Sequence, residues 1–82
     1  MIEKELWKKF ATMIVKKYYN PELKVTAVPH DDFDREVTEF TGGFSSYRIR
    51  EWKKAGSLYG FLYRLDDLRY AVVLPQEKKE KK

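Results

Sequence analysis

Arginine and aromatic side chains alternate along residues 47–74, and this alternation is the pattern in the chain that most directly suggests a chemistry. It occupies three stretches, at 47–52, 58–65 and 68–74. A period of two places alternate side chains on opposite faces of a β-sheet. Arginine binds phosphate through a fork of donors, and aromatic rings stack on bases. The pattern therefore indicates either a nucleic-acid surface or an ordinary core with a solvated rim.

A trial register of these strands places Arg64 directly opposite Arg69. Like charges in opposed positions destabilise a sheet unless a group of opposite charge lies between them, and a phosphate would serve. Lys53 and Lys54, at the neighbouring turn, are placed to reach a backbone phosphate. Further candidates for contact with nucleic acid are Arg48, Arg50, Tyr47 and Trp52. The alternative is a solvated face whose arginines pair with acids of the same chain.

Four apolar residues of the strands are predicted to lie on the sheet face that points away from the N-terminal helix. They are Ile49, Leu62, Ala71 and Val73. One helix cannot cover both faces of a sheet, and an exposed apolar patch often marks a partner site. The sequence therefore also predicts a protein interface, used by a homodimer or by another protein, unless the sheet curls into a small barrel.

Carboxylates cluster at Asp31, Asp32, Asp34 and Glu36, directly after the single histidine, His30. Carboxylate oxygens are ligands for hard cations such as Mg²⁺. However, no glycine stands where a calcium loop needs its sharp turn, and one histidine without cysteine cannot build a zinc site within one chain. We therefore predict a solvated acidic segment, no metal site and no cofactor.

The tripeptide Glu51-Trp52-Lys53 follows these acids and superficially resembles the strand motif of restriction-type nucleases. In that motif carboxylates bind Mg²⁺ and a lysine stabilises developing charge. Here a tight turn at Ala55-Gly56 is expected where such a motif would continue into a helix. The chain is therefore predicted to have no catalytic residues and not to be an enzyme, with a metal-dependent nuclease as the third choice of function.

Apolar residues at helical spacing predict a helix at 2–19, with several lysines on its solvent side and Asn20-Pro21 as its end. A β-branched run predicts a strand at 23–28. Residues 30–41 are open to two interpretations. The spacing of their apolar residues fits a helix, whereas their composition fits a loop followed by a strand at 36–41, and we favour the strand, with Gly42-Gly43 as a hairpin turn.

The remaining strands are predicted to be joined by two-residue turns at Ala55-Gly56 and Asp66-Asp67. In the resulting register Tyr63 faces Tyr70 and Phe61 faces Val72, which puts most of the aromatic rings, including Tyr59, under the N-terminal helix. A slip by one residue would exchange the two faces of the sheet, so the register at Asp66-Asp67 stays open.

The 82 residues are enough for one domain, predicted at 1–75, and for a charged tail at 76–82 that is expected to be disordered. Without cysteine, the domain must be stabilised by packing alone or with self-association. The predicted fold class is α+β, with a long N-terminal helix packed on an antiparallel meander of four to five strands.

The net charge of +4 is unevenly distributed, because residues 21–44 carry two basic and six acidic residues while the flanking segments are basic. No apolar run approaches the roughly 20 residues of a membrane helix, and no signal peptide is recognisable, so we expect a cytoplasmic protein without a membrane partner. Many Lys and Glu with a single Asn and a single Gln resemble a thermophile's composition. The leading functional prediction is a small non-enzymatic module, DNA-binding or otherwise nucleic-acid-binding or regulatory, that uses a basic sheet face.

Overall fold

The computed structural model of the protein describes residues 2–74, a range that contains three helices and four strands. The elements are, in chain order, α1 (Lys4–Tyr18), β1 (Tyr19–Asn20), β2 (Val25–Pro29), α2 (His30–Thr41), α3 (Ser46–Tyr59), β3 (Leu62–Arg64) and β4 (Arg69–Val72). The predicted α+β class is confirmed. The tail predicted at 76–82 lies outside the described residues.

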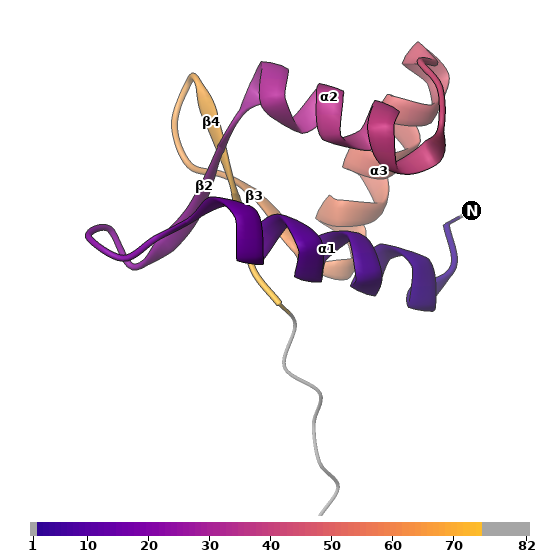
Figure 1. The fold of residues 1–82 in the computed structure, drawn as a ribbon. Coiled ribbons are helices and arrows are strands. Elements are labelled where there is room, and N and C mark those ends of the chain that lie inside the picture. The colour runs from indigo at the N-terminus through magenta and orange to yellow at the C-terminus, as the bar shows by residue number, and fades with distance from the viewer. Residues whose placement is uncertain (1, 75–82) are drawn as a thin grey trace, which may run out of the picture.

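The four strands form one antiparallel sheet in the order β1-β2-β4-β3, with the last strand of the chain between β2 and β3. This order differs from the simple meander that was predicted, and the sheet is open, so the alternative of a closed barrel is wrong. Figure 1 shows the sheet on the left and the helices to its right, all on one side of it. The domain is therefore a two-layer structure with its core between helices and sheet.

The N-terminal helix is confirmed, with α1 at Lys4–Tyr18 inside the predicted range. Its buried side chains recur at helical spacing and are Trp7, Phe10, Ala11 and Ile14. The side-chain oxygen of Asn20 then accepts hydrogen bonds from the backbone N–H groups of Glu22 and Leu23, which turns the chain back. The predicted second element is confirmed as β2, at Val25–Pro29.

The strand predicted at 36–41 is wrong, because these residues belong to α2. Phe33 and Val37 are fully buried one turn apart. The helical spacing of the apolar residues was therefore the correct signal, and the strand-like composition was not. Thr38 and Thr41 fit the helix because their hydroxyls donate to backbone carbonyls within it. Gly42 ends the helix in a left-handed conformation, with φ of 88°, and is not part of a hairpin.

The strand predicted at 47–52 and the turn predicted at Ala55-Gly56 are also wrong, because both lie within α3. Ile49 and Trp52 are both buried, and only a helix brings residues three apart to the same face. The side chain of Ser45 accepts a hydrogen bond from the backbone N–H of Arg48 and caps the helix. Gly60, with φ of 79°, ends it, so the strand predicted from residue 58 begins only at Leu62.

The last hairpin is correctly located but shifted by one residue from the trial register. Tyr63 pairs with Ala71 and Arg64 with Tyr70. The shift arises because the Asp66 carboxylate accepts hydrogen bonds from the backbone N–H groups of Leu68 and Arg69, which favours a four-residue connection at 65–68 over a two-residue turn. The slip exchanges the two faces of β3, so that Leu62 turns toward the helices and Tyr63 away from them, whereas Val72 of β4 keeps its predicted side.

The exchange of faces changes which side chains support α1. Tyr59 and Phe61 do lie under α1, where their rings stack on Trp7 at 5.4 and 4.8 Å between centroids. Tyr70 lies further along, in contact with Phe33. Tyr63, in contrast, is 53% exposed and does not belong to the core. Leu62 takes the inward position that was predicted for its neighbours.

Candidate nucleic-acid interface

Six of the eight residues predicted to contact nucleic acid lie on a single element, the helix α3. They are Tyr47, Arg48, Arg50, Trp52, Lys53 and Lys54. The other two, Arg64 and Arg69, lie in β3 and β4. The structure therefore separates the predicted basic sheet face into a basic helix and a hairpin.

The side of α3 that faces away from the core carries Tyr47, Arg50, Lys54 and Ser57, which we call the outer stripe. All four are exposed, and their spacing of three and four residues keeps them on one side of the helix. The opposite side packs on the core through Ile49, Trp52, Ala55 and Gly56. An open groove of about 540 Å³ follows the outer stripe and is also lined by Glu51 and Lys53.

The charge of α3 contrasts with that of the helix before it. Between Ser46 and Tyr59 there are four basic residues and one acid, whereas α2 contains five acids and one arginine. The single acid of α3, Glu51, accepts a hydrogen bond from the Tyr47 hydroxyl, and this bond raises the pKa of Tyr47. The outer stripe is therefore a cationic surface with a fixed aromatic hydroxyl at its N-terminal end.

Lys53 lies at the edge of this surface and holds α3 in place. Its ammonium is 3.2 Å from the Asp34 carboxylate of α2 and 5.6 Å from the centre of the Tyr70 ring in β4. Partial burial would lower the pKa of Lys53, but hydrogen bonds with Asp34 and Tyr70 outweigh it and raise the pKa. The side chain thus remains charged and joins α3 to two neighbouring elements.

Trp52 is placed where it cannot stack on a base, because it is only 2% exposed. Its ring contacts Phe10 of α1 and Phe40 of α2, with centroids 4.6 and 5.6 Å apart. Trp52 therefore supports α3 from the core side and does not contribute to its outer stripe.

Arg64 and Arg69 do not oppose each other, so the premise for a phosphate between them is wrong. Arg64 forms an ion pair with Asp67, and Arg69 forms one with Asp66 at 2.7 Å. The pKa of Asp66 is lowered by its hydrogen bond from Arg69 and by backbone hydrogen bonds. The hairpin is thereby electrically neutral and carries its own counter-charges.

The four residues of the predicted partner interface are split between the core and the surface. Ile49 and Leu62 are buried in the core, so their placement on a free sheet face is wrong. Ala71 and Val73 do lie on the side of the sheet opposite the helices, as the pairing of Ala71 with Ala27 and Tyr63 indicates.

The nuclease-like tripeptide does not form the predicted strand motif. Glu51 and Lys53 are two positions apart on α3 and therefore point to different sides of the helix. Within residues 2–74, no group of three or more His, Asp or Glu side chains is close enough to hold a metal ion. No helix in this range is long and apolar enough to cross a membrane.

Sequence reasoning missed the feature that presents the outer stripe, which is the succession of α2, a four-residue turn and α3. The turn consists of Gly42, Gly43, Phe44 and Ser45. Its signals in the sequence are Gly42, which is predicted in a hairpin turn but ends α2, and Ser45, which caps α3 and for which no role is predicted. Ser57 was missed for the same reason, because it joins the stripe only on a helix.

Comparison with known proteins assigns no relative to the chain: no protein-family model, no curated protein and no solved structure matches it.

Proposed function

We propose that the chain binds duplex DNA through α3, with the outer stripe inserted into the major groove. The observation that carries this proposal is that a cationic, solvent-facing stripe lies on the second helix of a helix-turn-helix unit, directly opposite the side that packs on the core. The ligand is still nucleic acid, as predicted from the sequence, but the contact is made by α3 and not by a sheet face.

The arrangement of α2 and α3 supports this proposal. Helix-turn-helix units join two crossing helices by a turn of three or four residues that often contains glycine. Here the turn has four residues, of which Gly42 and Gly43 are two, and Figure 1 shows α3 running across α2. In DNA-binding units of this kind the second helix enters the major groove, and its N-terminal residues contact base edges.

The chemistry of the outer stripe suits base edges. Arg50 and Lys54 can donate to the N7 and O6 atoms of guanine, and the Ser57 hydroxyl can bind several bases. Arg48 is exposed on the side of α3 toward the end of α2, where its guanidinium donates to the Thr41 carbonyl at 3.5 Å, and its long cationic side chain suits a phosphate contact outside the groove. The major groove of B-DNA admits a helix, whereas that of duplex RNA is deep and narrow, so the stripe favours DNA.

The test compares two double variants that remove the same charge. Arg50→Ala/Lys54→Ala alters the outer stripe, and Lys9→Ala/Lys16→Ala alters exposed lysines of α1. Fluorescence anisotropy with a labelled mixed-sequence duplex is expected to show affinity reduced about tenfold to a hundredfold for the first variant and much less for the second. Equal losses in both variants, or no binding by the wild type at low salt, would refute the proposal.

A further inference from the structure

Basic side chains without an acidic partner are concentrated on two helices. Many cations of residues 2–74 are neutralised by acids, as Lys17 of α1 is by Glu36 at 2.7 Å. Apart from Lys24, between β1 and β2, the described basic residues that form no ion pair lie on α1 and α3. They are Lys4, Lys9 and Lys16 on α1 and Arg48, Arg50 and Lys54 on α3. The set on α3 belongs to the DNA contact proposed above, whereas the set on α1 has no role yet.

The lysines of α1 gather on its solvent side. Lys9, Thr12 and Lys16 follow one another at spacings of three and four residues, which keeps them on one side of the helix, and all three are exposed. We call these three residues the lysine face. Its two ammonium groups are carried about 10 Å apart along the helix axis. Glu5, the one acid of α1, lies a turn before Lys9 and forms no ion pair with another of the residues 2–74.

The lysine face offers charge and little else. The Thr12 hydroxyl donates to the Lys8 carbonyl at 2.8 Å, so its proton is engaged within the helix. A lysine ammonium acts on phosphate as a point charge and needs no fixed geometry. Duplex DNA carries one negative charge for about every 1.7 Å of its axis, so several phosphates lie within the span of the two lysines. The face therefore suits the backbone of a duplex, whatever its sequence.

The lysine face and the outer stripe point to different sides of the molecule. The buried sides of α1 and α3 face each other, because the Phe10 ring lies 4.6 Å from the Trp52 ring and Trp7 stacks on Tyr59 at 5.4 Å between centroids. The lysine face and the outer stripe lie on the sides of their helices that point away from this contact. Figure 1 shows α1 passing in front of the end of α3. A duplex bound to the outer stripe therefore leaves the lysine face open to solvent.

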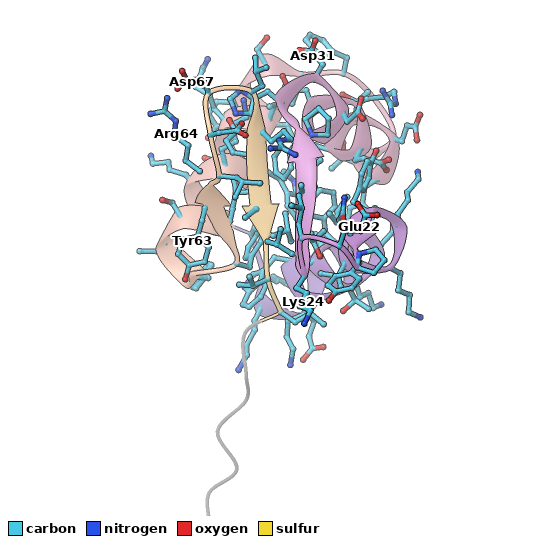
Figure 2. All side chains as sticks on the ribbon, turned by 90° about the vertical axis from the view of Figure 1, so that its left-hand side faces the viewer. Glu22, Lys24, Asp31, Tyr63, Arg64 and Asp67 are labelled. Carbon is cyan, nitrogen blue, oxygen red and sulfur yellow. The ribbon has the colours of Figure 1, made fainter. Side chains whose placement is uncertain are left out.

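The sheet offers no comparable surface. In Figure 2, which looks onto the sheet, Arg64 lies next to Asp67, with which it forms an ion pair. Arg69 is likewise paired with Asp66. Lys24, at the other end of the sheet in the same view, is a single cation. A second polyanion thus meets a row of uncompensated charge on α1 and not on the sheet.

We propose that the lysine face binds the phosphate backbone of a second duplex while the outer stripe holds the first, so that one copy of the chain bridges two duplexes. This proposal rests on the DNA contact proposed for α3. A few lysines bind a duplex weakly, but several chains bound along the first duplex present several lysine faces to the second, and their contacts reinforce one another. Bridging is therefore expected to increase steeply with the coverage of the first duplex.

Bridging is tested by saturating an immobilised duplex with protein at low salt and measuring capture of a second, labelled duplex. Lys9→Ala/Lys16→Ala is expected to reduce capture about tenfold, although it binds a single duplex nearly as tightly as the wild type. Lys24→Ala/Arg64→Ala is the matched control, because it removes two exposed cations outside both surfaces, and it should capture like the wild type. Capture by Lys9→Ala/Lys16→Ala that equals that of the wild type, or an equal loss in the control, overturns the proposal.

A mixture of two variants tests whether both contacts belong to one chain. Arg50→Ala/Lys54→Ala keeps the lysine face, and Lys9→Ala/Lys16→Ala keeps the outer stripe. The mixture should not restore capture, because no chain in it carries both surfaces. Restored capture would mean that bridging proceeds through self-association of the chain, and it would overturn the proposal.

The bridging function and the function proposed for α3 fail in different ways. A wild type that binds a single duplex but captures no second one overturns bridging alone. A wild type that binds no duplex at low salt overturns the function proposed for α3, and bridging with it.

Discussion

At the scale of single residues, the most constrained ionisable group is Glu36, which is 2% exposed. Its carboxylate lies 2.7 Å from the Lys17 ammonium and 2.7 Å from the Tyr18 hydroxyl, so α2 is fastened to the end of α1. Burial would raise the pKa of Glu36, but the hydrogen bonds from Lys17 and Tyr18 outweigh it and lower the pKa. Burial, together with the bond to Glu36, raises the pKa of Tyr18 to about 12.

The depressed pKa of Glu36 gives a prediction about acid stability. A carboxyl group whose pKa is lower in the folded state contributes stability above its unfolded pKa of about 4.3, and this stability is lost as pH falls through the folded pKa. We expect Glu36→Gln to lower the free energy of unfolding at pH 7 by about 1–3 kcal/mol, and to flatten its decline between pH 5 and pH 3. Urea unfolding across that range measures both effects.

The control for this prediction is Glu39→Gln, an exposed carboxylate on the same helix. It should change neither the stability at pH 7 nor the acid dependence by more than a few tenths of a kcal/mol. Identical pH profiles for Glu36→Gln and the wild type would contradict the role assigned to Glu36.

At the scale of elements, the sequence predicts α1 and β2 well because each has one consistent signal. In α1 the apolar spacing and the following Asn20-Pro21 agree, and in β2 the β-branched run is bounded by turn residues. At α2 and α3 two signals conflict. β-branched and aromatic side chains favour a strand locally, but burial of Ile49 and Trp52 on one side, against α1 and α2, stabilises a helix.

The candidate site, like the fold, can be predicted from the sequence only in part. The residue types that suit nucleic acid could be identified from sequence, because charge and aromaticity do not depend on the fold. Their grouping could not, since Tyr47, Arg50 and Lys54 share one side only on a helix. The loss of the Arg64–Arg69 pair likewise depends on a single hydrogen-bonding carboxylate, Asp66, that shifts the register by one residue.

The contact of α3 with β3 gives a prediction at this scale. A Cβ atom on Gly56 would lie 2.5 Å from the Leu62 Cβ, so Gly56→Ala must push the helix and the strand apart. We expect it to destabilise the fold by about 1–3 kcal/mol, even though alanine is the better helix former by about 1 kcal/mol. Gly43→Ala is the control, because no atom lies within 4 Å of its added Cβ. Equal stability of both variants in urea unfolding would show that the contact is not close.

At the scale of the whole molecule, charge is sorted by element. The acidic helix α2 and the neutral hairpin of β3 and β4 lie beside the basic helix α3. The lysines of α1 form a second basic surface, so a polyanion has two favourable directions of approach. This sorting is hidden in the net charge of +4.

Salt dependence tests the direction of approach. Each phosphate neutralised on B-DNA adds about −0.9 to the slope of log affinity against log salt. Arg48→Ala is expected to make the slope less negative by about 0.9, and Arg64→Ala to leave it unchanged, since Arg64 is paired with Asp67. Anisotropy titrations between 50 and 200 mM salt measure the slopes. The reverse pattern would place the hairpin, not α3, on the DNA backbone.

The position of β4 in the sheet also affects how the chain can fold during synthesis. β2 and β3 both pair with β4 and not with each other, so neither pairing can form before residues 69–72 have left the ribosome. Until then the nascent chain can form only its three helices and the short β1–β2 turn. The apolar sides of these elements do not yet have the complete sheet to pack against. Completion of the fold therefore depends on contacts between residues some 40 positions apart, a separation that slows folding compared with a purely helical domain.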